Sequence, residues 1–266
     1  MFISGESLDD ISNNMNLELD LVFEWMNNNR LSFNISKTNY MIMSSHGKRY
    51  DPGDGKINIY GCGIDQVQTT KCLGLNIDEH LTWKSHIDYI SQKISKGIGI
   101  LLRARKALQV DSLITLYNSI IKPYFTYCIT LWGNTFKTHL NKLVILQKKI
   151  IRLITFSDYR AHTQPLFLKL KFLTVKELYT YFSVIHIFKC IKCLYPSMFW
   201  KSFILNRSQR YPFNIQQLFY NKNMCKCSLR FCGPAIWNKL SKCIKEINSI
   251  YTFKKKVKTL LLSNID

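Results

Sequence analysis

The sequence predicts an α+β fold: a small antiparallel β part with one packed helix in roughly the first eighty residues, then a mostly α-helical body. Two periodicities support this prediction. Leu31, Phe33 and Ile35 alternate with polar residues, as in a half-buried strand or strand-like connection. From His86 onward, apolar residues recur at every third or fourth position, as on one face of a helix. A chain of 266 residues can bury a core without disulfides.

Charge is abundant and unevenly distributed. The chain has 37 Lys and Arg against 17 Asp and Glu, a formal net charge of +20. Six acidic residues precede Arg30, whereas only four lie between Tyr89 and Ile265. Positive charge in the last two-thirds suits a polyanion, most simply nucleic acid. A ribosomal or membrane-surface protein, or a chain merely biased toward Asn, Ile and Lys, remains an alternative.

Cysteines and hydropathy bear on location and metal binding. The chain has nine cysteines and no secretory signal at Met1, which favours reduced thiols in the nucleus or cytoplasm rather than secretion. No apolar run reaches the ~18 residues of a membrane span, so no membrane partner is expected. Cys190 and Cys193 form a CxxC pair, but no second pair has matching spacing. We therefore expect buried thiols there and no metal site.

The first eighty residues read as one helix among short strands. Met1–Gly5 is predicted as a strand, and Ser7 or Asp9 as the cap of the helix after it. The core face of that helix is Leu8, Ile11, Met15, Leu19, Val22 and Met26. A lysine-bearing turn at Lys37–Thr38 follows. Further strands are predicted at Tyr40–Met43, Ile57–Tyr60 and Lys71–Asp78.

The remaining chain reads as helices. His86–Leu108 carries a buried stripe, with basic residues on a neighbouring face and two glycines, Gly97 and Gly99, that could mark a close approach. The stripe is Ile87, Ile90, Ile94, Ile98 and Leu101. Asp111 or Ser112 is predicted to cap a second helix, which Pro123 should end or kink. Leu140–Leu153 and Leu168–Tyr195 are predicted as further helices.

Several motifs in this order resemble the C-terminal part of non-LTR (jockey- or RTE-like) retrotransposon reverse transcriptases. The W…N.L.LN..KT..M pattern of the palm end is matched by Trp25, Asn29, Leu31, Phe33, Asn34, Lys37, Thr38 and Met41. The primer-grip pattern is matched by Lys71, Leu73, Gly74, Ile77, Asp78, Leu81 and Trp83. A late R…G…W-N block is matched by Arg230, Gly233, Trp237 and Asn238.

This resemblance implies a domain division and candidate site residues. It divides the chain into palm remnant and primer-grip strands (1–83), thumb helices (84–160) and a basic helical C-terminal extension (161–266). It assigns Lys37 as a general acid on the pyrophosphate side, with a solvated lysine at a strand end as the alternative. The implied primer-grip residues are Lys71, Leu73 and Gly74. The implied nucleic-acid-binding residues are Lys93, Lys96, Arg103, Lys148, Lys149, Arg152, Lys254, Lys255 and Lys258.

The resemblance also bears on catalysis. Members of the family polymerise DNA with two Mg²⁺ ions held by Asp residues. Asp9 and Asp10 lie at a predicted helix start rather than in a turn between strands, so they are not expected to be that pair. By this alignment the metal-binding carboxylates, the fingers and most of the palm lie upstream. We therefore expect no cofactor in this chain, Mg²⁺ only for the full-length polymerase, and no polymerisation by the chain alone.

The expected partners are RNA, RNA–DNA hybrid and the upstream palm and fingers segment. Three alternatives remain at this stage. The chain could be a non-enzymatic nucleic-acid-binding protein derived from a decayed element, a maturase-like intron protein, or a relic that folds poorly. The late W-N block favours the retrotransposon over the maturase.

Overall fold

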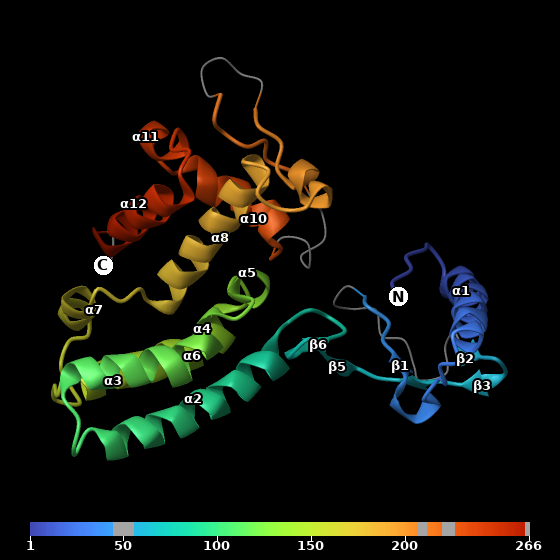
Figure 1. Cartoon of the computed structure of the whole chain (residues 1–266), viewed down its shortest axis with the longest axis horizontal. Coiled ribbons are helices and arrows are strands. Elements are labelled where there is room, and N and C mark those ends of the chain that lie inside the picture. Colours follow the sequence, from blue (N-terminus) through green and yellow to red (C-terminus); the bar gives the residue numbers. More distant parts are fainter. Residues whose placement is uncertain (45–55, 207–211, 220–226, 264–266) are drawn as a thin grey trace. The chain divides into compact units, whose positions relative to one another are not determined.

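The computed structural model describes residues 1–44, 56–206, 212–219 and 227–263. The chain forms two compact units, which we call unit 1 (Met1–Leu81) and unit 2 (Thr82–Asp266) (Figure 1). The sequence places domain boundaries after residues 83 and 160. Each unit is described by itself below.

Unit 1 contains one long helix and several two- to four-residue strands. The helix α1 spans Leu8–Asn28, and the 3₁₀ turn η1 spans Ile35–Lys37. The strands are β1 (Asn39–Tyr40), β2 (Asn58–Ile59), β3 (Cys62–Gly63), β4 (Asp65–Gln66), β5 (Thr69–Cys72) and β6 (Leu75–Asp78). β2 pairs with β3 and β5 with β6, both antiparallel as predicted, but β1 and β4 are parallel. The prediction of a wholly antiparallel β part was therefore wrong.

Helix α1 is capped and packed largely as its sequence predicts. Ser7 is the N-cap: its Oγ accepts from the Asp10 amide (3.1 Å) and donates to the Asp10 carboxylate (2.5 Å). The core of unit 1 is Leu19 of α1 against Ile57 and Ile59. The predicted strand at Met1–Gly5 is absent, because these residues make no ladder with any described strand.

The strand character predicted around the lysine-bearing turn is confirmed only at Tyr40. The alternation from Leu31 to Ile35 ends in η1, and only Asn39–Tyr40 of the following segment is extended and paired. Asn34 accounts for the turn. Its carbonyl accepts from the Thr38 hydroxyl and its side chain from the Ser36 hydroxyl, both at 2.8 Å. Local side-chain bonds of this kind compete with strand pairing.

Lys71–Asp78 is a hairpin, not the single strand predicted. β5 and β6 pair Cys72 with Leu75, which leaves Leu73 and Gly74 as a two-residue turn. Both have positive φ, 46° and 83°, which is the geometry of a turn that matches the twist of a hairpin. Glycine at the second position adopts that φ at little cost, whereas Leu73 is an unusual occupant of the first.

Unit 2 is helical in its described part. Its helices are α2 (Lys84–Ala104), α3 (Val110–Leu116), α4 (Lys122–Thr126), α5 (Ile129–Trp132), α6 (Lys137–Ile154), α7 (Gln164–Leu170), α8 (Val175–Ile191), α10 (Leu229–Asn238), α11 (Lys242–Lys245) and α12 (Ile250–Ser263). A π-helical segment, η2 (Tyr117–Ile121), joins α3 to α4, and a 3₁₀ helix, η3 (Ser197–Ser202), follows α8. The chain is therefore mainly helical with small sheets, which confirms the α+β class at this level.

Two predicted helix limits in unit 2 were wrong. The Leu168–Tyr195 helix is split, because Lys171 adopts a left-handed conformation (φ 53°) and Thr174 then starts α8 with a capping box to Glu177. The N-cap of α3 is Gln109 rather than Asp111 or Ser112. Pro123 lies in the first turn of α4, where its missing N–H is tolerated.

The α2 stripe predicted from periodicity is confirmed. All five of its residues are buried, and α2 packs against α6 and η2. Gly97 is where α2 approaches η2 most closely: a Cβ there would lie 2.6 Å from Ile121 Cγ1. The equivalent position at Gly99 faces open space. Of the two glycines, only Gly97 marks a close approach.

The C-terminal helices gather around α8, against which α10 and α12 both pack (Figure 1). Phe253 of α12 stacks on Phe188 of α8, with ring centroids 4.2 Å apart. The late W-N motif has a structural role here. The Trp237 indole donates to Phe213 O (2.8 Å), and the Asn238 amide bonds both the N–H and the C=O of Ile215. These bonds fasten the segment before α10 to the helical core.

Candidate nucleic-acid interface

The two units differ in charge. Residues 82–266 contain 31 of the 37 Lys and Arg and 6 of the 17 Asp and Glu, a formal net charge of +25. Residues 1–81 contain the remaining 6 basic and 11 acidic residues, a net charge of −5. Long-range attraction of a polyanion therefore acts on unit 2.

Helix α2 presents a basic face opposite its buried stripe. Lys96 and Arg103 are exposed and lie seven residues apart, so two helical turns place them on the same side. Lys93 is half-buried on the flank, with Nζ 5.4 Å from the centroid of the Tyr89 ring. The structure thus brings these three predicted residues together on one rigid helix.

The predicted residues on α6 have different environments. Lys148 and Lys149 are exposed, and consecutive positions point roughly 100° apart around a helix. Arg152 is half-buried: its Nε donates to Ala161 O (2.9 Å), and its guanidinium lies 6.0 Å from the centroid of the Tyr159 ring. Arg152 therefore holds the segment after α6, and its Nε is already engaged.

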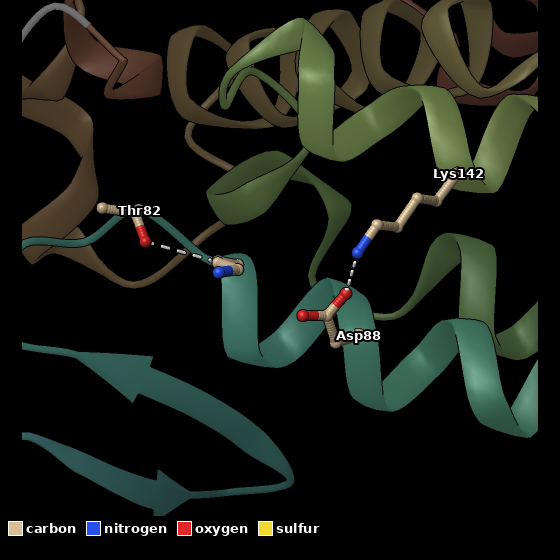
Figure 2. Close-up of polar contacts among 4 residues, drawn as sticks. Thr82, Asp88 and Lys142 are labelled. Atoms are coloured by element: carbon tan, nitrogen blue, oxygen red, sulfur yellow. Dashed lines mark hydrogen bonds and ion pairs between the residues drawn. The ribbon is translucent and has the colours of Figure 1, made fainter.

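An ion pair joins α6 to the start of α2. Lys142 Nζ reaches Asp88 Oδ1, as Figure 2 shows, beside the Thr82 hydroxyl that accepts from the Lys84 amide (3.4 Å). Asp88 is the single acidic residue of α2. Because Lys142 offsets its charge, Asp88 opposes an approaching phosphate less than a lone carboxylate would.

The predicted residues of α12 belong to a different part of unit 2. Lys255 and Lys258 are exposed and Lys254 is half-buried. α12 packs on α8, whereas α2 packs on α6, and Figure 1 shows the two helices in separate parts of the unit. The nine residues predicted to bind nucleic acid therefore do not form a single surface.

The predicted primer-grip residues lie together at the end of the β5–β6 hairpin in unit 1. Lys71 is exposed in β5, and Leu73 and Gly74 form the turn. Leu73 is 85% exposed, so the tip presents an apolar side chain to solvent. Lys37 is also in unit 1, exposed at the end of η1.

The acidic pair Asp9 and Asp10 lies in the first turn of α1. Asp10 is engaged with the N-cap Ser7, and Asp9 is the next residue on the same helical turn. Within the described ranges, no group of three or more His, Cys, Asp or Glu residues is arranged to hold a metal ion. Of the CxxC pair, Cys190 is buried, which raises the pKa of its thiol to about 11, whereas Cys193 is exposed.

Sequence reasoning missed three lysines, Lys122, Lys171 and Lys189, that line hollows together with two of the predicted residues. Lys122 and Lys171 line a hollow with Lys258, and Lys189 lines a neighbouring one with Lys254. These lysines come from α4, the α7–α8 connection, α8 and α12, so no local spacing could have predicted their proximity. In the part of the chain that the structure describes, no helix is both long and apolar enough to cross a bilayer.

Comparison with known proteins shows that the chain is similar to RNA-directed DNA polymerases of mobile elements, as the motifs predict. The chain is 30% identical over 156 residues, 58% of its length, to the RNA-directed DNA polymerase from mobile element jockey of Drosophila funebris. It is 26% identical over 155 residues to the probable RNA-directed DNA polymerase from transposon X-element of Drosophila melanogaster. A similar match, 26% over 133 residues, is to the probable polymerase from transposon BS of that species. The resemblance is thus confirmed.

The similarity concerns a limited part of these relatives. The matched region covers 17% of the jockey and X-element polymerases and 15% of the BS polymerase. The chain therefore spans about a sixth of the length of the relatives it matches. No protein-family model matches the chain, and no solved structure matches it.

Proposed function

We propose that this chain is the C-terminal region of a non-LTR retrotransposon reverse transcriptase and that unit 2 binds the template–primer as RNA or RNA–DNA hybrid. The basic face of α2 is the observation that supports this most directly. It lies in a unit of net charge +25, and the similar proteins are RNA-directed DNA polymerases by name. In this proposal unit 1 supplies the end of the palm and the primer grip.

The geometry of α2 suits a phosphate backbone. Lys96 and Arg103 are separated by seven residues, roughly 10 Å along the helix axis. That separation corresponds to roughly three base-pair steps of a duplex, whose phosphates on one strand are spaced ~3.4 Å along the axis. Contacts of this kind hold a nucleic acid in place without reading its sequence. This fits a surface that must accept any template.

Polymerisation itself is assigned to the rest of the polymerase. The described residues lack a carboxylate cluster suited to magnesium, so this chain is proposed to hold the substrate rather than to join nucleotides. Unit 1 also has a surface suited to a protein partner. Leu17, Leu21 and Trp25 form a stripe on α1 and are 66%, 61% and 60% exposed. We assign this stripe as the face that the preceding palm segment covers.

The first test is binding by the purified chain to an RNA–DNA hybrid. Replacing Lys96 and Arg103 together by Gln should weaken the complex at fixed salt, because two phosphate contacts are lost. The matched control replaces exposed Lys176 and Lys239 by Gln, which removes the same charge elsewhere on unit 2. Equal loss of affinity in both variants would show that total charge, and not α2, determines binding.

The second test is primer extension with Mg²⁺ and deoxynucleotides. We expect the chain to bind the primer–template and to incorporate no nucleotides. Sustained incorporation by the purified chain would contradict the assignment of polymerisation to other parts of the polymerase. A complete reverse transcriptase in parallel reactions checks the substrate.

A further inference from the structure

Two hollows on unit 2 share a pair of aromatic rings on α8. One, of about 260 Å³, is lined by Lys122, Asn118 and Lys258. The other, of about 400 Å³, extends toward Lys189 and Lys254. Tyr181 and Phe182 line both. Because the two hollows share these rings, we treat them as one surface, which we call the α8 groove. Both α4 and α12 pack against α8 beside it (Figure 1).

The α8 groove is strongly cationic. Its lining includes Lys122, Lys171, Lys189, Lys254 and Lys258, and no Asp or Glu is among its described lining residues. Lys122 and Lys258 line the same hollow, and burial, followed by the charge of Lys258, lowers the pKa of the Lys122 ammonium. Like charges brought together without a counter-charge are unfavourable. A ligand with several negative charges would relieve that repulsion.

The centre of the groove is aromatic. The Tyr181 and Phe182 rings are half-buried, nearly perpendicular (83°), with centroids 5.4 Å apart. At the far end, Lys189 Nζ lies 5.0 Å from the centroid of the Tyr195 ring. Rings alternating with lysines are the arrangement that binds single strands: bases stack on the rings while ammonium groups contact phosphates. A duplex keeps its bases stacked inside and cannot use such rings.

One residue that lines the groove, Asn118, has a buried polar atom. The Asn118 Oδ1 atom is buried and has no hydrogen-bond partner among the described residues. Asn118 lies in the π-helical segment η2, a departure from α-helix that is frequent at functional sites.

We propose that the α8 groove binds a single-stranded nucleic acid, with bases against Tyr181 and Phe182 and phosphates against Lys122 and Lys258. This site is separate from the α2 face and does not depend on duplex binding there. A single strand and a duplex should therefore occupy the same molecule together, as a template and its unpaired extension would.

The experiment compares three variants of the 266-residue chain by fluorescence anisotropy, with a labelled 12-nucleotide single strand and with an RNA–DNA hybrid. The groove variant is Lys122→Gln/Lys258→Gln, the α2 variant is Lys96→Gln/Arg103→Gln, and the control is Lys176→Gln/Lys239→Gln. Each of the six side chains is at least partly exposed, so these changes should not lower the melting temperature. RNA and DNA strands of the same sequence are both measured.

For the single strand, log K falls linearly with log salt, and the groove variant should reduce the size of that slope by about 1.4, roughly 0.7 per lost phosphate contact. Its hybrid binding should resemble that of the control. A further variant, Tyr181→Leu, keeps an apolar side chain but removes stacking and should weaken the single-strand complex about tenfold. Photo-crosslinking of a 5-iodouridine strand to wild type should modify the peptide containing Tyr181 and Phe182.

Two results would overturn the proposal. One is that the groove variant and the control bind the single strand equally. The other is that saturating hybrid displaces the single strand completely and crosslinking misses α8. Failure of the α2 variant to affect hybrid binding would instead refute the function proposed for α2 and leave the groove proposal intact.

Discussion

Unit 1 and unit 2 come from one sequence but bury their helices to different extents. In α1 of unit 1, only Ser12 and Leu19 are buried, and an apolar stripe faces solvent. In α2 of unit 2, the same length of helix buries seven residues. The units also carry opposite net charge, −5 and +25. The comparison indicates that unit 2 owes its stability to its own core, whereas unit 1 presents surface suited to a partner.

The largest expected difference between the units is the loss of stability when a large apolar side chain is replaced by alanine. Phe253→Ala should lower the free energy of unfolding of unit 2 by about 3–5 kcal/mol, because Phe253 is fully buried against Phe188 and Trp237. Leu21→Ala on α1 should change stability by less than about 0.5 kcal/mol, because Leu21 is exposed. Urea unfolding measures both, and comparable losses would contradict the comparison.

Gln147 tests whether the buried polar contacts of unit 2 are as important as its packing. Its Nε2 donates to Leu173 O and its Oε1 accepts from the Val175 amide, both at 2.9 Å. Gln147→Leu leaves two buried backbone groups unpaired and should cost about 2–4 kcal/mol. The control Gln92→Leu replaces an exposed glutamine on α2 and should be nearly neutral. A neutral Gln147→Leu would show that water or a shifted backbone satisfies these groups.

Alanine substitutions at the two glycines of α2 should change the stability of unit 2 in opposite directions. Gly97→Ala must push Ile121 away and should destabilise unit 2 by about 1 kcal/mol after the gain in helix propensity. Gly99→Ala meets no atom within 4 Å and should stabilise it by about 0.5–1 kcal/mol. Thermal melts of the two variants measure both effects. Stabilisation by both substitutions would mean that α2 and η2 do not approach as closely as described.

A smaller effect should appear with pH. Burial lowers the pKa of the His86 imidazole below its ordinary 6.5, in the core of unit 2 beside Trp132. Just below pH 6.5 the unfolded chain then binds more protons than the folded chain. The contribution of neutral His86 to the free energy of unfolding is therefore complete above pH 6.5 and is lost as the pH falls. The pKa of His186 is lowered by burial and by Lys189, which acts in the same direction. The variant His86→Gln should show a smaller fall in melting temperature on acidification than the wild type. If the fall is unchanged, other titrating groups cause it.

The sequence predicted the parts of the fold that periodicity governs. The α2 stripe and the Ser7 cap are local patterns, and both are confirmed. Two predicted elements were wrong because one residue in each adopts a positive φ. Leu73 turns the predicted strand into a hairpin, and Lys171 ends the predicted helix. Neither residue type favours that region, so the tertiary structure determines it.

The candidate site was predictable to the extent that it is local. Lys93, Lys96 and Arg103 share one helix, and helical spacing was enough to place them together. Arg152 was expected to meet phosphate, but its Nε is bonded to Ala161 O, a contact that spacing does not reveal. Lys258 was predicted, but its proximity to Lys122 and Lys171 was not, because it depends on the packing of α4 and α12 against α8.

The most direct test of the central claim is a salt titration of hybrid binding to the full chain. If α2 contacts phosphates, log K should fall linearly with log salt, and Lys96→Gln/Arg103→Gln should reduce that slope by about 1.8, roughly 0.9 per contact. The Lys176→Gln/Lys239→Gln control should keep the wild-type slope. An unchanged slope in the α2 variant would contradict the claim that this helix holds the nucleic acid.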